Sequence, residues 1–133
     1  MAKILPEVTE IKMPVGESVT YQITTPSGYE FIALFFAVKK SAEHRDTTAV
    51  INWNSVVNTA SLYKNGADWY LEFKPVDTAK IAPYKYVGGI RGLTSDGKVK
   101  SFWPDGKLPT KDNAWFTFEL TGGLPTNVSV VGE

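Results

Sequence analysis

Polar and apolar residues alternate in the first well-marked segment of the chain, residues 17–25. Val19, Tyr21 and Ile23 occupy one set of alternating positions, and the residues between them are mostly hydroxylated or amide side chains. Successive side chains of a β-strand point to opposite faces of its sheet. The pattern therefore predicts a strand with one buried face and one face in water.

The next segment, residues 29–39, has an unbroken apolar run over positions 31–38. A short run that is apolar on both faces is typical of a strand in the centre of a sheet. Pro26-Ser27-Gly28 separates this segment from the preceding strand and is a turn sequence. We expect the two strands to form a hairpin.

Similar patterns continue to the end of the chain and are punctuated by Asn65-Gly66 and Asp96-Gly97, which are strong hairpin signals. Gly88, Gly89 and Gly92 interrupt one of these segments, which suggests a bulge or a close approach by another backbone. The further strands predicted are residues 47–53, 56–63, 68–74, 84–94, 98–103 and 114–120.

These elements predict an all-β fold, an antiparallel two-sheet sandwich of about eight or nine strands. The domain would span residues 15–121. Residues 1–14 would form an N-terminal arm, with an edge strand over 8–13, and residues 122–133 a C-terminal tail. Helix is expected only over 77–82 and, more weakly, over 41–46.

Composition removes several functional classes. The 133 residues contain fourteen basic and fourteen acidic side chains, and this balance argues against a nucleic-acid partner. The absence of cysteine excludes disulfides, zinc–thiolate sites and thiol catalysis. We also expect no export signal and no membrane partner, because no apolar run has the length of a signal peptide or a membrane span.

Candidate catalytic and metal-binding residues are few. His44-Arg45-Asp46 matches the catalytic-loop tripeptide of protein kinases, but the glycine-rich loop and the metal-binding Asp-Phe-Gly are missing. Ser41, His44 and Asp46 are too crowded for a hydrolase triad. Asp96 and Asp105 could offer oxygen ligands to calcium, although Asp-Gly pairs are common in turns. We therefore expect no enzyme activity and assign no catalytic, cofactor or metal residue.

Aromatic residues give the richest signal, with four tryptophans, six tyrosines and seven phenylalanines. Trp69 alternates with Leu71 and Phe73 and is predicted to be in the core. Trp103 and Trp115 are harder to bury, so we expect them at an interaction surface, in contact with protein or stacked on a sugar ring.

The most distinctive stretch is a corner, residues 75–83, that separates two predicted strands. Asp77-Thr78 lies within it, and Tyr84 and Tyr86 open the strand that follows. This order resembles the corner between strands E and F of immunoglobulin-like domains, where a tyrosine hydroxyl binds the corner backbone. The resemblance implies an immunoglobulin-like β-sandwich in which Asp77, Thr78, Tyr84 and Tyr86 shape the turn between the sheets.

A second resemblance extends over roughly residues 14–121. The chain is similar to small β-sandwich proteins of tailed-phage virions, including the N-terminal domains of baseplate upper proteins and tail or head accessory proteins. It shares an early Gly16-Glu17-Ser18-Val19-Thr20 strand, the apolar strand, the Asp77-Thr78 turn and a glycine-closed hairpin. The resemblance implies a non-enzymatic structural protein, made in the host cytoplasm and located in the virion, whose partners are other virion proteins and copies of itself.

Two functional hypotheses follow. In the first, the chain assembles with its neighbours, and Val128, Val130 and Val131 in the tail add a strand to a neighbouring sheet. In the alternative, the chain is a carbohydrate-binding or host-adhesion module that stacks a host-surface glycan on Trp103, Trp115 or Tyr63.

Overall fold

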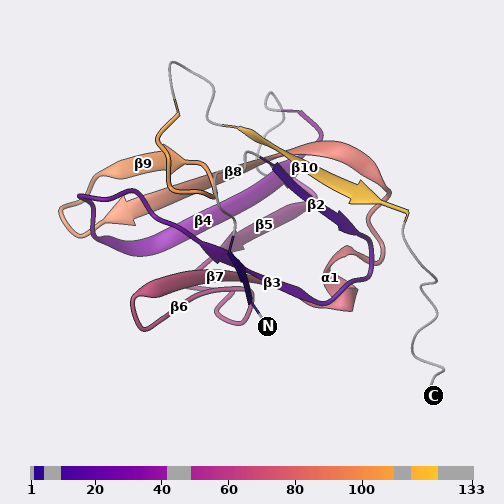
Figure 1. Ribbon diagram of the computed structural model, residues 1–133, viewed down its shortest axis with the longest axis horizontal. Coiled ribbons are helices and arrows are strands. Elements are labelled where there is room, and N and C mark those ends of the chain that lie inside the picture. Colours follow the sequence, from indigo (N-terminus) through magenta and orange to yellow (C-terminus); the bar gives the residue numbers. More distant parts are fainter. Residues whose placement is uncertain (1, 5–9, 42–48, 110–114, 123–133) are drawn as a thin grey trace.

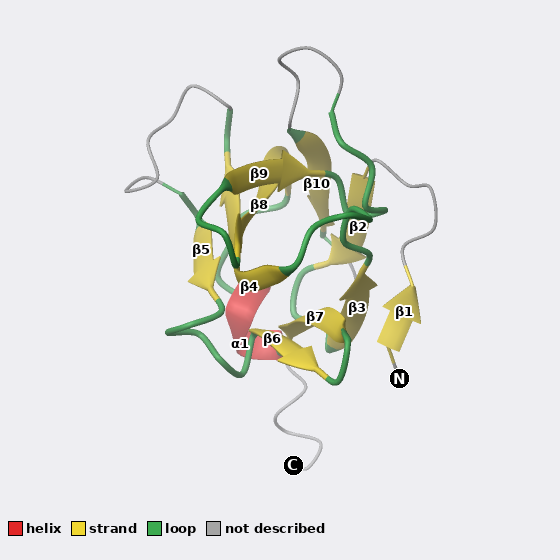
Figure 2. Ribbon diagram, turned by 90° about the vertical axis from the view of Figure 1, so that its left-hand side faces the viewer, coloured by secondary structure: helices red, strands yellow, loops and turns green. Residues whose placement is uncertain are grey.

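The computed structural model describes residues 2–4, 10–41, 49–109 and 115–122 (Figure 1). Within these residues the chain is mostly β, with two sheets and one short helix (Figure 2). The elements in chain order are β1 (Ala2–Ile4), β2 (Glu10–Pro14), β3 (Val19–Ile23), β4 (Phe31–Lys39), β5 (Ile51–Asn54), β6 (Leu62–Asn65), β7 (Asp68–Phe73), α1 (Pro75–Thr78), β8 (Tyr84–Thr94), β9 (Val99–Phe102) and β10 (Phe116–Thr121).

The smaller sheet has the strand order β1-β3-β7-β6, and the larger has the order β2-β10-β8-β4-β5, with β9 also paired to β8. The predicted all-β, two-sheet class is therefore confirmed. The strand β4 lies between β8 and β5, so its predicted central position is also confirmed. No helix in the described part of the chain is long and apolar enough to cross a membrane.

The expected hairpin between β3 and β4 is wrong, because the two strands lie in different sheets. The strand β3 pairs with β7, whereas β4 pairs with β5 and β8. Residues 24–30 between them carry the chain across the sandwich, a distance of about 10 Å that a connection of this length spans easily. This crossing brings the buried faces of β3 and β4 to opposite sides of one core.

The expectation of purely antiparallel sheets is also wrong. The strand β1 pairs parallel with β3, and β2 pairs parallel with β10. In β2, which forms an edge of the larger sheet, Ile11 and Met13 are buried, whereas Glu10 and Lys12 are exposed. Burial of these two side chains anchors the N-terminal segment in the larger sheet. The local sequence only partly indicates this position.

The predicted strand over residues 56–63 is largely a loop, and β6 begins only at Leu62. The side chain of Asn54 accepts hydrogen bonds from the backbone N–H groups of Val56 and Val57, at 2.8 and 3.0 Å. Such local side-chain bonds compete with pairing in a sheet. The following hairpin is confirmed, although Asn65 is itself paired with Asp68, so the two-residue loop begins at Gly66.

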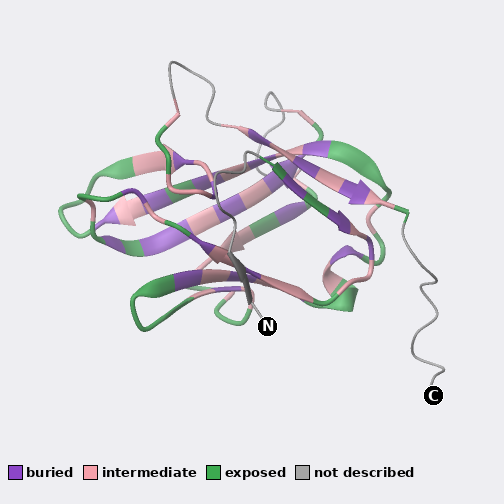
Figure 3. Cartoon of the chain, in the orientation of Figure 1, coloured by how far each residue is buried: buried purple, intermediate pink, exposed green. Residues whose placement is uncertain are grey.

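Buried residues recur along the strands of both sheets (Figure 3). They form a core between the sheets that is rich in aromatic rings. Phe36 of β4 contacts Phe73 of β7 across the sandwich, with ring centroids 6.2 Å apart in an edge-on arrangement. Phe73 in turn lies 5.8 Å from Phe118 of β10. Trp69 is buried, as predicted. These contacts join strands far apart in sequence into one hydrophobic cluster.

The glycines of β8 accommodate side chains, not the backbone or bulge that the sequence suggested. A Cβ on Gly92 would lie 2.3 Å from Phe31, and one on Gly88 would lie 2.8 Å from Phe116. The pairing of β8 with β4 shifts register elsewhere, between Phe31 and Ala33. Side-chain rings occupy the space that a larger residue would need.

We predict that Gly92→Ala destabilises the fold by about 1–3 kcal/mol, because the added methyl group overpacks the core against Phe31 and Leu34. Gly122→Ala is the matched control, since no described residue lies within 4 Å of a Cβ at that position. Urea unfolding of both variants measures the difference. Equal stability of the two variants would contradict the packing seen at Gly92.

Candidate functional site

The corner after β7 is held by short-range hydrogen bonds. The backbone N–H of Lys74 donates to the carboxylate of Asp77 at 2.7 Å, and the N–H of Asp77 donates to the carbonyl of Lys74 at 2.9 Å. Pro75 occupies the first turn of α1, where its missing N–H costs nothing. Asp77 therefore shapes the turn, as the sequence predicts.

Thr78 links this corner to a distant part of the chain. Its side chain is fully buried, and its hydroxyl oxygen accepts a hydrogen bond from the backbone N–H of Gly16 at 2.8 Å. Gly16 lies in the turn between β2 and β3 and has a positive φ of 78°. One hydroxyl thus fixes that turn, which joins the two sheets, against the corner.

The two tyrosines of the corner differ in role. The Tyr86 hydroxyl donates to the carbonyl of Ala82 at 2.6 Å, while Tyr84 is 49% exposed. Burial raises the pKa of the Tyr86 hydroxyl, and the neighbouring Tyr84 raises it further. The hydroxyl therefore stays protonated and keeps its donor role at neutral pH. Of the two tyrosines, Tyr86 makes the backbone contact that the sequence resemblance implies.

Two of the aromatic residues proposed for binding have contacts inside the protein. Trp103 is half-buried and packs against the core, and its indole nitrogen is buried without a hydrogen-bond partner among the described residues. Tyr63 lies on the smaller sheet, where its hydroxyl donates to Glu72 at 2.8 Å and its ring stacks on Tyr70. This hydrogen bond is the main cause of a raised pKa for Tyr63.

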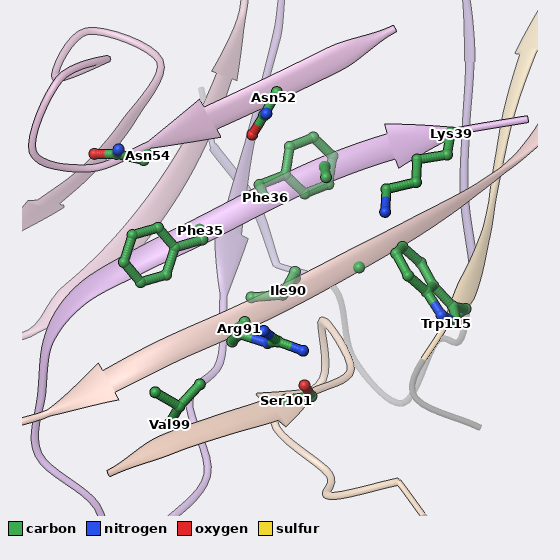
Figure 4. Close-up of a pocket in the computed structure, with 12 residues that line it drawn as sticks. Phe35, Phe36, Lys39, Asn52, Asn54, Ile90, Arg91, Val99, Ser101 and Trp115 are labelled. Atoms are coloured by element: carbon green, nitrogen blue, oxygen red, sulfur yellow. The ribbon is translucent and has the colours of Figure 1, made fainter. Parts of the chain in front are cut away.

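Trp115 contributes to a depression of the surface that lies on the outer face of the larger sheet (Figure 4). We call it the outer-face hollow. It has a volume of about 480 Å³, within the range of about 300–1,000 Å³ typical of small-molecule sites. Its outward-facing lining comes from four neighbouring strands and Trp115, and comprises Phe35, Ala37, Lys39, Asn52, Asn54, Gly89, Arg91, Val99 and Ser101.

The register of the strands explains why the surface is hollow at this point. Ala37 of β4 lies opposite Gly89 of β8 and Asn52 of β5, so the floor has almost no side-chain volume. In the adjacent row Phe35 lies between Asn54 and Arg91, where larger side chains form one wall.

Trp115 forms the opposite wall. Both β10 and β9 pair with the same edge of β8, β10 with its first half and β9 with its second half. Trp115 directly precedes β10 and lies where the two paired regions meet. A Cβ on Gly89 would lie 2.7 Å from the indole, so only glycine leaves room for this ring. The ammonium nitrogen of Lys39 is 5.0 Å from the ring centroid, a cation–π distance, and the Lys39 side chain is buried.

Sequence reasoning identified Trp115 but missed Phe35, Asn52 and Arg91. Strand alternation would have placed Phe35 on the face opposite Phe36, and that signal was available. Its neighbours could not be deduced, because they depend on the register of β4 with β5 and β8.

The turn aspartates proposed as calcium ligands bind within their own turns. Asp96 accepts a hydrogen bond from the Thr94 hydroxyl, and Asp105 accepts one from the backbone N–H of Lys107 at 3.0 Å. Among the residues that the structure describes, no group of three or more His, Cys, Asp or Glu side chains could hold a metal ion. His44 and the predicted tail residues, Val128, Val130 and Val131, lie outside the described residues.

Comparison of the chain with protein-family models, with curated proteins and with solved structures gives no match.

We predict that Tyr86→Phe lowers the free energy of unfolding by about 0.5–1.5 kcal/mol, because the Ala82 carbonyl loses its buried donor. Tyr84→Phe removes the same atom from a half-exposed side chain of the same corner, and we expect a change within about 0.5 kcal/mol. Chemical denaturation of both variants measures the two values. A similar loss in both would show that the Tyr86 hydrogen bond does not stabilise the corner.

Proposed function

We propose that this chain is an immunoglobulin-like β-sandwich that acts as a non-enzymatic structural module of a phage virion, through contacts with copies of itself and with other virion proteins. The observation that carries the proposal is the corner between the sheets, where the Tyr86 hydroxyl binds the backbone four residues before it. This is the contact that the resemblance to immunoglobulin-like domains leads us to expect.

The strand order supports the immunoglobulin-like part of the proposal. If β3 to β8 are named B, C, C′, D, E and F, and β10 is named G, the sheets contain the neighbours B-E-D and G-F-C-C′. Immunoglobulin domains of the variable type have these neighbours. Two features depart from the pattern: β9 forms an additional hairpin with β8, and Gly88 occupies the position of the second cysteine, two residues after the corner tyrosine.

An exposed group of aliphatic side chains supports the assembly part. Ile32 is 59% exposed, and Val56 and Val57 are 70% and 72% exposed. Ile32 and Val56 line the same shallow depression, and Ser55 holds the two segments together through backbone and side-chain hydrogen bonds to Leu34. We call Ile32, Val56 and Val57 the aliphatic patch. Apolar patches of this kind mark sites of protein contact.

We predict that the purified chain self-associates and that the double variant Ile32→Asp, Val56→Asp shifts it to the monomer, because two carboxylates would have to be desolvated at the contact. Native mass spectrometry over a range of concentrations measures the change. Val76→Asp is the matched control, since Val76 is 73% exposed on α1, outside the patch.

A monomer at every concentration would contradict self-assembly, and equal effects of all aspartate substitutions would contradict the role of the patch. The gene neighbourhood gives an independent test of the virion assignment. Adjacent portal, capsid or tail genes would support it, and a metabolic operon would contradict it.

The strand-addition hypothesis for Val128, Val130 and Val131 remains a prediction. A chain shortened to residues 1–121 should form smaller assemblies, because an added strand contributes its main-chain hydrogen bonds to the contact. Native mass spectrometry of the shortened chain beside the full chain provides the test. An unchanged mass would rule out a role of the tail in self-assembly.

A further inference from the structure

We propose that the outer-face hollow binds the ring of a carboxylated sugar, a hexuronic-acid unit, with its carboxylate at Arg91. The inference concerns a different surface from the aliphatic patch, because neither Ile32 nor Val56 lines the hollow. It gives the carbohydrate-binding alternative a defined site and a defined ligand class. It does not depend on the assembly of the chain.

The shape of the hollow suits a single flat ring. Its floor is Ala37 and Gly89, which lie opposite each other in register. Phe35 lies at one end and Trp115 at the other (Figure 4). Both aromatic side chains are only half-buried. A pyranose ring has an apolar C–H face that packs against aromatic rings. Small-molecule sites commonly combine such apolar walls with a few polar groups.

The polar groups of the hollow match the hydroxyls of a sugar. Asn52 and Asn54 project from β5 on one side, and Ser101 projects from β9 on the other (Figure 4). The Asn54 amide oxygen accepts from the N–H groups of Val56 and Val57, so its NH2 group is the part that can donate to a ligand, while the Ser101 hydroxyl can both donate and accept. Sugar hydroxyls require this mixture, because each can donate one hydrogen bond and accept others.

The positive charge of the lining favours a ligand that carries a carboxylate. The hollow is lined by Lys39 and Arg91 and by no Asp or Glu among the residues that the structure describes. Arg91 is exposed and forms no ion pair with a described residue. Its planar guanidinium can bind both oxygens of a carboxylate at once. Arg91 lies beside Phe35 in the strand register, so a ring on Phe35 would place a ring substituent at this cation.

A nucleotide is the competing ligand, because bases also stack on aromatic rings and phosphates also bind arginine. The sugar is favoured by the balanced charge of the chain, since nucleic-acid sites have a basic surface.

The test is an NMR titration of the full chain with α-1,4-digalacturonate and with α-1,4-galactobiose, in calcium-free buffer. The two disaccharides share a skeleton and differ in whether a carboxylate or a hydroxymethyl group is present. We expect saturable shifts of the Trp115 indole N–H, assigned with Trp115→Phe, and affinity for the acid about tenfold higher, as expected for a hydrogen-bonded ion pair.

Three variants locate the contact. Arg91→Gln should abolish the preference for the acid and leave the weaker binding of galactobiose unchanged. Phe35→Leu keeps apolar volume but removes the ring face, and should weaken both sugars about tenfold or more. Lys85→Gln is the charge control, because Lys85 lies on the same strand and the same face as Arg91 but outside the hollow, and it should change neither affinity.

Absence of saturable binding by both sugars would overturn the proposal, as would binding that survives Phe35→Leu and Arg91→Gln unchanged. Tighter binding of a nucleoside monophosphate than of digalacturonate, with the same dependence on Arg91, would assign the hollow to nucleotides instead. The native mass of the variants, measured in parallel, separates this result from the assembly proposal, because the hollow and the aliphatic patch share no residue.

Discussion

The structure depends on the space left by missing side chains along β8, the strand to which β4, β9 and β10 all pair. Gly88 and Gly92 face the core, where they admit the rings of Phe116 and Phe31. Gly89 faces outward and admits Trp115. The loss of three Cβ atoms lowers the β-propensity of this strand, and the packing of large rings against its backbone offsets that loss. The same feature therefore shapes both the core and the outer-face hollow.

The corner after β7 is the second point that holds the sheets together. The Thr78 hydroxyl binds the turn between β2 and β3, and the Tyr86 hydroxyl binds the corner backbone. Both side chains are buried, and each hydroxyl has its hydrogen-bond partner within the protein. The distinctive sequence of this stretch is thus explained by the hydrogen bonds that hold the corner. We propose that the outer surfaces of the sandwich carry the function.

Two such surfaces belong to different parts of the larger sheet and its loops. The outer-face hollow combines aromatic, amide and cationic groups over a small-residue floor. The aliphatic patch, by contrast, presents aliphatic side chains to solvent at the start of β4 and in the loop after β5. Their chemistry suits different partners, a polar ring for the first and a protein surface for the second. The two proposed roles, assembly and sugar binding, are therefore compatible in one chain.

The sequence by itself determined the local elements. Alternation predicted β3 and β7 with the correct buried faces, and turn residues predicted the hairpins at Gly66 and Gly97. These properties depend on neighbouring residues alone. Only the tertiary structure decided that β3 and β4 lie in different sheets, that two strand pairs run parallel, and that the loop after Asn54 replaces a strand.

The candidate site shows the same division between what the sequence predicts and what the tertiary structure decides. An incompletely buried Trp115 could be expected from its position, but the row that joins Phe35 to Arg91 arises from strand register, which long-range packing sets.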